Sequence, residues 1–83
     1  MSNADKLFEE LGYNETEKHA NGIEYINESE DKIIGFIDYD NYGKVVTLDI
    51  FEDFITMQEL KAINKKCEEL GWIEWVKHIK AMS

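Results

Sequence analysis

The chain has 83 residues, of which 43% are hydrophobic and 33% charged, and its net charge is −9. This length predicts one domain over residues 1–83, and the apolar content excludes a disordered chain. An acidic surface repels phosphate backbones and anionic lipids, so we expect neither nucleic acid nor a membrane as a partner.

The acidic charge is concentrated in the middle of the chain. Residues 24–53 have nine acids and two lysines, whereas residues 54–83 have four acids and five lysines. Such a field attracts basic proteins and accelerates their association. We therefore expect a protein partner, with a basic one favoured.

Cysteine usage and the first residues indicate a reducing compartment. Cys67 is the single cysteine, so no intramolecular disulfide can form. The start of the chain lacks the cationic and apolar regions of a secretion signal, and no apolar run reaches the ~20 residues of a membrane span. These features predict a cytoplasmic location. Residues 1–3 fit either a cloning remnant or a helix cap.

The first element expected is a helix. Its apolar residues recur at helical spacing: Ala4, Leu7, Phe8 and Leu11. Ser2 or Asn3 can cap it. Residues 13–21 are polar and end in Asn21-Gly22, which predicts a loop that closes in a turn.

Three strands of an antiparallel meander are predicted next, at residues 22–28, 31–39 and 44–51. The connections are short enough for hairpin loops, and Gly43 can take the positive φ that such turns require. Alternation assigns one apolar face to Ile23, Tyr25, Ile34, Phe36, Val46, Leu48 and Ile50. The opposite face is less polar than a solvated sheet, so we expect the C-terminal segment or another subunit to cover it.

A second helix is predicted from the capping box Thr56-Met57-Gln58-Glu59, in which the first and last side chains each satisfy a backbone amide of the first turn. Its apolar stripe would consist of Leu60, Ile63, Cys67 and Leu70. Residues 72–82 have Trp and Ile side chains at helical spacing, which predicts a short last helix, with a strand as the alternative. The predicted fold class is α+β, in the order α-β-β-β-α-α.

The segments FEELGY (residues 8–13) and CEELGW (residues 67–72) are alike without indicating a duplication, because nothing else around them repeats. Each places Gly where a helix C-cap needs the left-handed conformation, followed by an aromatic residue that can fold back on the last turn. We interpret them as two helix ends.

No residue pattern predicts catalysis, so we expect a protein that is not an enzyme. The pairs Glu9-Glu10 and Glu68-Glu69 are helix neighbours that point about 100° apart, so neither forms a paired acid and base. Cys67 lies on an apolar stripe, whereas His19 lies in a polar loop and His78 on the last helix, which favours an inert thiol.

Metal and phosphate sites are also disfavoured. Asp38, Asp40, Gly43 and Asp49 match part of a calcium-loop pattern, but Tyr42 occupies a ligand position and the flanks are strand-like. The glycines are scattered, so they form no phosphate-binding loop. We expect a hairpin turn at this pattern and neither a metal nor a cofactor.

Two blocks of the sequence, ADKLFEELGY near the start and ITMQELKAINKKCEELGWI near the end, have a familiar arrangement. In these blocks the chain resembles short, uncharacterised proteins encoded in phages and prophages of Gram-positive bacteria. The resemblance covers about 30 residues. It implies an accessory protein acting in the host cytoplasm and carries over no catalytic residue.

The functional expectation is a small, acidic, non-enzymatic protein-interaction module. The alternative is a homodimeric structural protein, and an inhibitor with a DNA-like acidic surface or a small-ligand-binding protein is less favoured. The acids at the hairpin ends and after the third strand would supply the surface, together with two apolar residues of the last helix. These residues are Glu28, Glu30, Asp31, Asp38, Asp40, Glu52, Asp53, Trp75 and Ile79.

Overall fold

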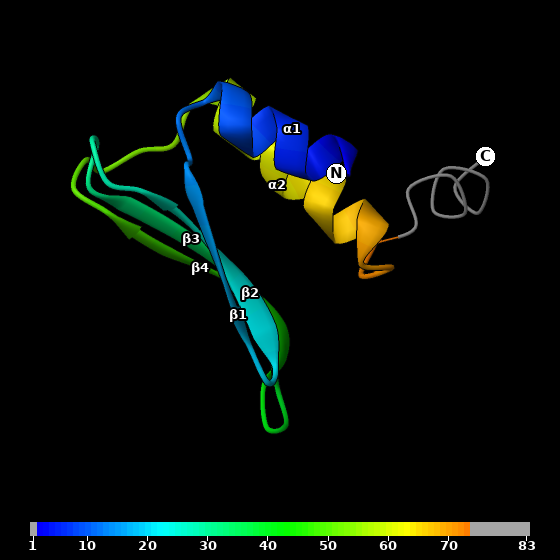
Figure 1. The fold of residues 1–83 in the computed structure, drawn as a ribbon. Helices are drawn as coiled ribbons and strands as arrows, with labels where there is room; N and C mark the ends of the chain where they lie inside the picture. The colour runs from blue at the N-terminus through cyan, green and yellow to red at the C-terminus, as the bar shows by residue number, and fades with distance from the viewer. Residues whose placement is uncertain (1, 74–83) are drawn as a thin grey trace.

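The computed structural model describes residues 2–73, which form two helices packed on one face of a four-stranded antiparallel sheet (Figure 1). The elements in chain order are α1 (Asn3–Glu10), β1 (Glu15–His19), β2 (Gly22–Asn27), β3 (Lys32–Tyr39), β4 (Gly43–Ile50) and α2 (Met57–Glu69). The strands are neighbours in the same order, β1-β2-β3-β4. The predicted α+β class is therefore confirmed.

The prediction of a three-stranded meander is wrong, because residues 15–19 form a fourth strand where a polar loop was expected. β1 pairs with β2 from Glu15 opposite Ile26 to His19 opposite Gly22. The sequence of β1, Glu-Thr-Glu-Lys-His, has no apolar alternation, and at the edge of a sheet it needs none. Its stability comes from the backbone hydrogen bonds to β2, and no local sequence pattern in β1 predicts this pairing.

Both helix ends follow the predicted C-cap geometry. Gly12 and Gly71 have φ values of 95° and 75°. The amide of Tyr13 donates to Phe8 O at 3.0 Å, and the amide of Trp72 donates to Cys67 O at 2.9 Å. Each aromatic residue therefore closes a Schellman motif that satisfies a carbonyl of the last helical turn.

Both helix starts are capped by hydroxyl side chains. Ser2 accepts from the amide of Asp5 at α1, and Thr56 accepts from the amide of Glu59 at α2. Glu59 in turn accepts from the amide of Thr56 at 2.8 Å, which confirms the predicted capping box. Glu69 near the end of α2 accepts from the amide of Ala4 at 3.0 Å, so it ties the first turn of α1 to α2.

The core lies between the helices and the central strands. Its buried members are Phe8, Tyr13, Tyr25, Ile34, Phe36, Ala62, Ile63 and Cys67. The rings of Phe8 and Tyr25 stack with centroids 4.0 Å apart, and this contact joins α1 to β2. The apolar sheet face predicted from alternation is the face that meets the helices. On β4, however, Val46 and Leu48 remain 37% and 47% exposed, because the helices pack over β2 and β3.

The buried face of α2 differs from the predicted stripe. Ala62, Ile63 and Cys67 are buried as its centre, whereas Leu60 and Leu70 are exposed. Glu59 takes the remaining buried position, where a charged residue is rare unless it is paired. The face of the helix is therefore set by a buried polar contact as well as by apolar side chains.

The predicted last helix, with Trp75 and Ile79, lies almost entirely outside the described residues. Within the described part of the chain, neither helix has the length and apolar character that crossing a bilayer requires.

Candidate interaction surface

The seven acids predicted to form one surface lie at two opposite ends of the sheet. The register of β3 and β4 joins Lys32 to Ile50 at one end and Tyr39 to Gly43 at the other. The larger group lies at the first end and consists of Glu28, Glu30, Asp31, Glu52 and Asp53. Asp38 and Asp40 lie at the second end. The predicted acids therefore form two separate groups and not one continuous surface.

Two exposed phenylalanines lie among the larger group of acids. Phe51 is 83% exposed and Phe54 is 60% exposed, although both are large apolar side chains. A shallow cleft of about 550 Å³ runs between them and the β2–β3 turn. Its lining residues, which we call the Phe51–Phe54 surface, are Ser29, Glu30, Asp31, Lys32, Phe51, Glu52 and Phe54. Sequence reasoning identified the acids here but assigned Phe51 to a strand, and so missed the aromatic part.

The β2–β3 turn that borders this surface is shaped by a buried asparagine. Asn27 is 1% exposed, and its Oδ1 accepts from Ser29 Oγ at 2.9 Å and from the amide of Glu30 at 3.1 Å. Its Nδ2 donates to Leu11 O at 3.4 Å, which anchors the turn to the end of α1. Asp31 adopts the left-handed conformation with φ 55°, which aspartate tolerates better than most residues. These contacts fix where the acids of the turn lie.

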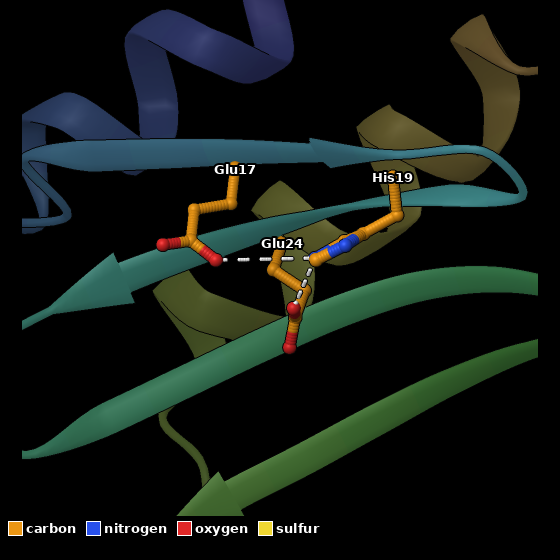
Figure 2. Close-up of side chains that lie close together, drawn as sticks. All are labelled: Glu17, His19 and Glu24. Atoms are coloured by element: carbon orange, nitrogen blue, oxygen red, sulfur yellow. Dashed lines mark hydrogen bonds and ion pairs between the residues drawn. The ribbon is translucent and has the colours of Figure 1, made fainter.

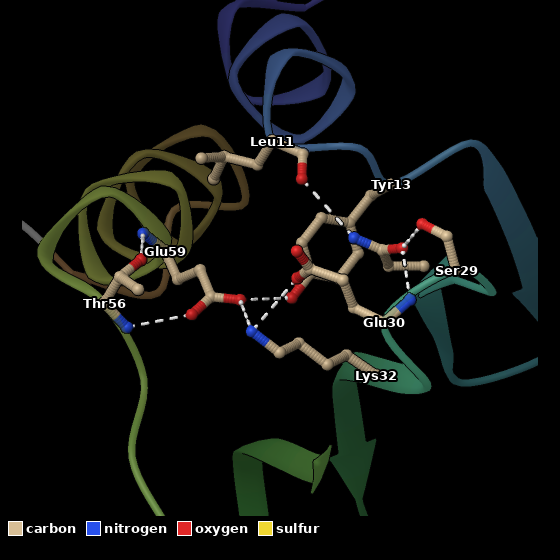
Figure 3. A network of polar contacts seen from close by, with 8 residues as sticks. Leu11, Tyr13, Ser29, Glu30, Lys32, Thr56 and Glu59 are labelled. Carbon is tan, nitrogen blue, oxygen red and sulfur yellow. Dashed lines mark hydrogen bonds and ion pairs between the residues drawn. The ribbon is translucent and has the colours of Figure 1, made fainter. Parts of the chain in front are cut away.

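A buried polar network (Figure 3) shares Glu30 and Lys32 with the lining of the Phe51–Phe54 surface. Lys32 Nζ lies 3.2 Å from Glu30 Oε2 and 3.2 Å from Glu59 Oε2. Tyr13 Oη donates to the same Glu59 oxygen at 2.6 Å. The side chain of Glu30 is half exposed, whereas those of Lys32 and Glu59 are buried. The positive charge of Lys32 is thus matched by two acids, and the surface above remains acidic.

The network shifts the pKa of each of its buried members. Burial raises the pKa of Glu59, but hydrogen bonds from Thr56, Tyr13 and Lys32 outweigh it and leave the pKa below its usual value. Burial lowers the pKa of Lys32, and the contacts with Glu30 and Glu59 reverse this and raise it. Burial and the Glu59 carboxylate both raise the pKa of Tyr13. All three shifts favour the ion pair with a neutral tyrosine as donor.

The other end of the sheet differs in composition. Asp38 Oδ2 lies 3.7 Å from Lys44 Nζ with both side chains about half exposed, so part of its charge is compensated. Tyr42 is 84% exposed and contacts the ring of Tyr39 edge to face. The predicted hairpin is confirmed, because β3 and β4 flank this turn and Gly43 has φ 79°. Asp49 lies opposite Ile33, near the other end of the β3–β4 ladder from the pair Asp38–Lys44, so Asp38 and Asp49 do not converge on one loop.

A third cluster lies on the sheet face away from the helices. Glu17, His19 and Glu24 each offer one ligand atom, and these atoms all lie within 4.8 Å of one another (Figure 2). Sequence reasoning placed His19 in a loop and missed the cluster. The Glu-x-His spacing with a glutamate beyond a two-residue turn could have indicated it, but only once the hairpin register is known.

The remaining reactive groups are engaged in packing. Burial raises the pKa of the Cys67 thiol, which agrees with the inert thiol predicted from its stripe. A polar cleft of about 350 Å³ lies beside α1 and contains Asp5 and Tyr25, but the Tyr25 hydroxyl already donates to Asp5. In the described part of the chain, every buried side-chain nitrogen and oxygen has a hydrogen-bond partner.

The fold is thus a two-layer α+β domain with helix-strand order α-β-β-β-β-α over residues 2–73. No protein-family model matches the chain. The searches of curated proteins and of solved structures likewise returned no match.

Proposed function

We propose that this protein is a non-enzymatic interaction module that binds another protein through the Phe51–Phe54 surface. The observation that carries the proposal is the exposure of Phe51 and Phe54 beside a cleft bordered by acids. Two exposed aromatic rings in one place are costly in water and are typical of contact sites, where aromatic residues supply much of the binding energy.

The chemistry of the surface favours a partner segment with lysine or arginine next to apolar side chains. The acids Glu30, Asp31 and Glu52 attract the cation, and the ring faces of the phenylalanines bind it further while apolar groups cover the rings. Lys32 does not oppose this field, because Glu30 and Glu59 neutralise it. This composition supports the acidic accessory protein that the resemblance implies.

The test compares the surface with the opposite end of the sheet. Immobilised wild-type chain, the double variant Phe51→Ser/Phe54→Ser and the control Tyr42→Ser would be exposed to nuclease-treated lysate of a Gram-positive bacterium and the captured proteins read by mass spectrometry. We expect one basic protein that is captured by wild type and Tyr42→Ser, is lost from the double variant, and weakens with salt. Equal capture by all three chains, or no capture by wild type, would refute the proposal.

Self-association through β4 is the second candidate function. β4 is an edge strand, and its Val46 and Leu48 lie on the helix-facing side of the sheet but remain partly exposed there, because the helices do not extend over β4. Pairing of two β4 strands would continue the sheet and bury both side chains. Light scattering after size exclusion should then give a dimer that Leu48→Lys converts to a monomer. A wild-type monomer at the highest soluble concentration would exclude this candidate.

A further inference from the structure

We propose that Glu17, His19 and Glu24 form a binding site for one divalent transition-metal ion of the zinc type. This site is separate from the Phe51–Phe54 surface and does not depend on it. The three side chains come from β1 and β2 and project from the sheet face opposite the helices (Figure 2).

The hairpin register explains why these side chains meet. Glu17 lies directly opposite Glu24, and His19 lies two residues further along β1 on the same face. Tyr25, the neighbour of Glu24, points the other way into the core, which fixes the outward direction of Glu24. The cluster is therefore held by the backbone pairing of β1 with β2, and β2 contributes Tyr25 to the core.

The distances fit coordination by a small ion. His19 Nε2 lies 2.5 Å from Glu24 Oε1 and 3.9 Å from Glu17 Oε2. Zinc bonds of about 2.0–2.2 Å in a tetrahedral arrangement separate the ligand atoms by roughly 3.3 Å, which lies between these two values. An ion would widen the first contact and shorten the second, and the side chains of Glu17 and His19 are exposed enough to adjust.

The surroundings leave room for such an ion and for an exchangeable ligand. A Cβ on Gly35 would lie 3.3 Å from Glu24 Cγ, so glycine there lets Glu24 lie over the sheet. A shallow cleft of about 250 Å³ adjoins the cluster and includes His19, Glu24 and Thr47 among its lining residues. Three protein ligands leave one tetrahedral position open, and this position is accessible to solvent.

The ligand set selects the class of metal. An imidazole nitrogen with two carboxylates suits zinc and its neighbours in the first transition series, whereas calcium takes 6–8 oxygen ligands and magnesium keeps most of its waters. The two glutamates also supply negative charge that compensates a divalent ion. The competing account is a metal-free hydrogen bond between His19 and Glu24, and the experiment below distinguishes the two.

The full chain would be titrated with zinc chloride by isothermal calorimetry, with the imidazole signals followed by NMR. We expect one ion per chain, with the signals of His19 shifted. His19→Ala and Glu24→Gln should each weaken binding by about tenfold or more, the effect of losing a contact to a metal site. Glu28→Gln and His78→Ala serve as controls that keep the three ligands.

Either of two results would overturn the proposal. One is the absence of binding at millimolar zinc, which would leave His19 and Glu24 as a hydrogen-bonded pair only. The other is binding that survives His19→Ala or is lost in His78→Ala, which would assign the ion to another part of the chain. Circular dichroism of His19→Ala should match wild type because this side chain is exposed, so a loss of binding there reports the site and not the fold.

Discussion

The buried contact between Lys32 and Glu59 can be tested with a double-mutant cycle of Glu59→Gln and Lys32→Met. Glutamine keeps an oxygen for the Tyr13 hydroxyl and for the Thr56 amide, so the change removes mainly the charge next to Lys32. Lys32 then retains only Glu30, whose side chain is half exposed, as an anionic neighbour. We therefore expect each single variant to lose about 2 kcal/mol of unfolding free energy, below the 3–5 kcal/mol of a fully broken buried pair.

The double variant should lose less than the sum of the two singles. With the charge and its partner both replaced, neither leaves a buried ion behind, so we expect a coupling energy of about 1–2 kcal/mol. Urea unfolding followed by far-ultraviolet circular dichroism gives the four free energies by linear extrapolation. The control cycle is Asp38→Asn with Lys44→Met, an exposed pair whose coupling should stay below about 1 kcal/mol.

A coupling for Lys32 and Glu59 no larger than that of the exposed control would refute this reasoning. It would mean that the buried pair contributes no more than a solvated one, and that Tyr13 and the capping box alone account for the burial of Glu59. Variants that are unfolded without urea would have lost more unfolding free energy than expected. The same cycle would then be measured with a stabilising osmolyte present.

The remaining predictions concern acid and three glycines. Because the folded-state pKa of Glu59 is lowered, its contribution to stability is complete above the usual pKa of 4.5 and is lost as the pH falls through the folded-state pKa. The urea midpoint of Glu59→Gln should therefore fall less steeply with decreasing pH than that of the wild type. Gly71→Ala should lower the unfolding free energy by about 1 kcal/mol through left-handed strain alone. Gly12→Ala should lower it further, because its Cβ would also lie 3.1 Å from the buried side-chain amide of Asn27. Equal urea midpoints for the two variants would contradict this. Gly35→Ala brings its Cβ into a clash with Thr47 Oγ1, so adding Thr47→Ala should recover part of the lost unfolding free energy.

Local features were predicted correctly because the residues that determine them are adjacent in the chain. The capping box at Thr56 and the two glycine helix ends involve groups within one helical turn, so a short stretch of sequence contains the whole interaction. The hairpin at Gly43 is of the same kind, since its turn requires a positive φ next to short strands.

Features that depend on pairing between distant residues were not predictable in this way. β1 consists of polar residues, and it forms a strand because its backbone pairs with the N–H and C=O groups at the edge of β2. The sequence indicates Glu59 only as part of a helix cap, whereas contacts with Tyr13 after α1 and with Lys32 of β3 make it a buried acid. The cluster of Glu17, His19 and Glu24 likewise exists only once the register of the hairpin is set.

The Phe51–Phe54 surface depends both on local sequence and on contacts between distant residues. Its charge is visible in the sequence, but its shape depends on the buried groups beneath it, because Asn27 fixes the turn that presents Glu30 and Lys32 connects that acid to Glu59 of α2. A carboxylate held by a buried lysine loses less side-chain entropy on binding than a free one. The polar network buries the charges of Lys32 and Glu59 and, through Lys32, holds Glu30 in place at the edge of the Phe51–Phe54 surface. Loss of this network should therefore weaken partner binding even where the chain remains folded.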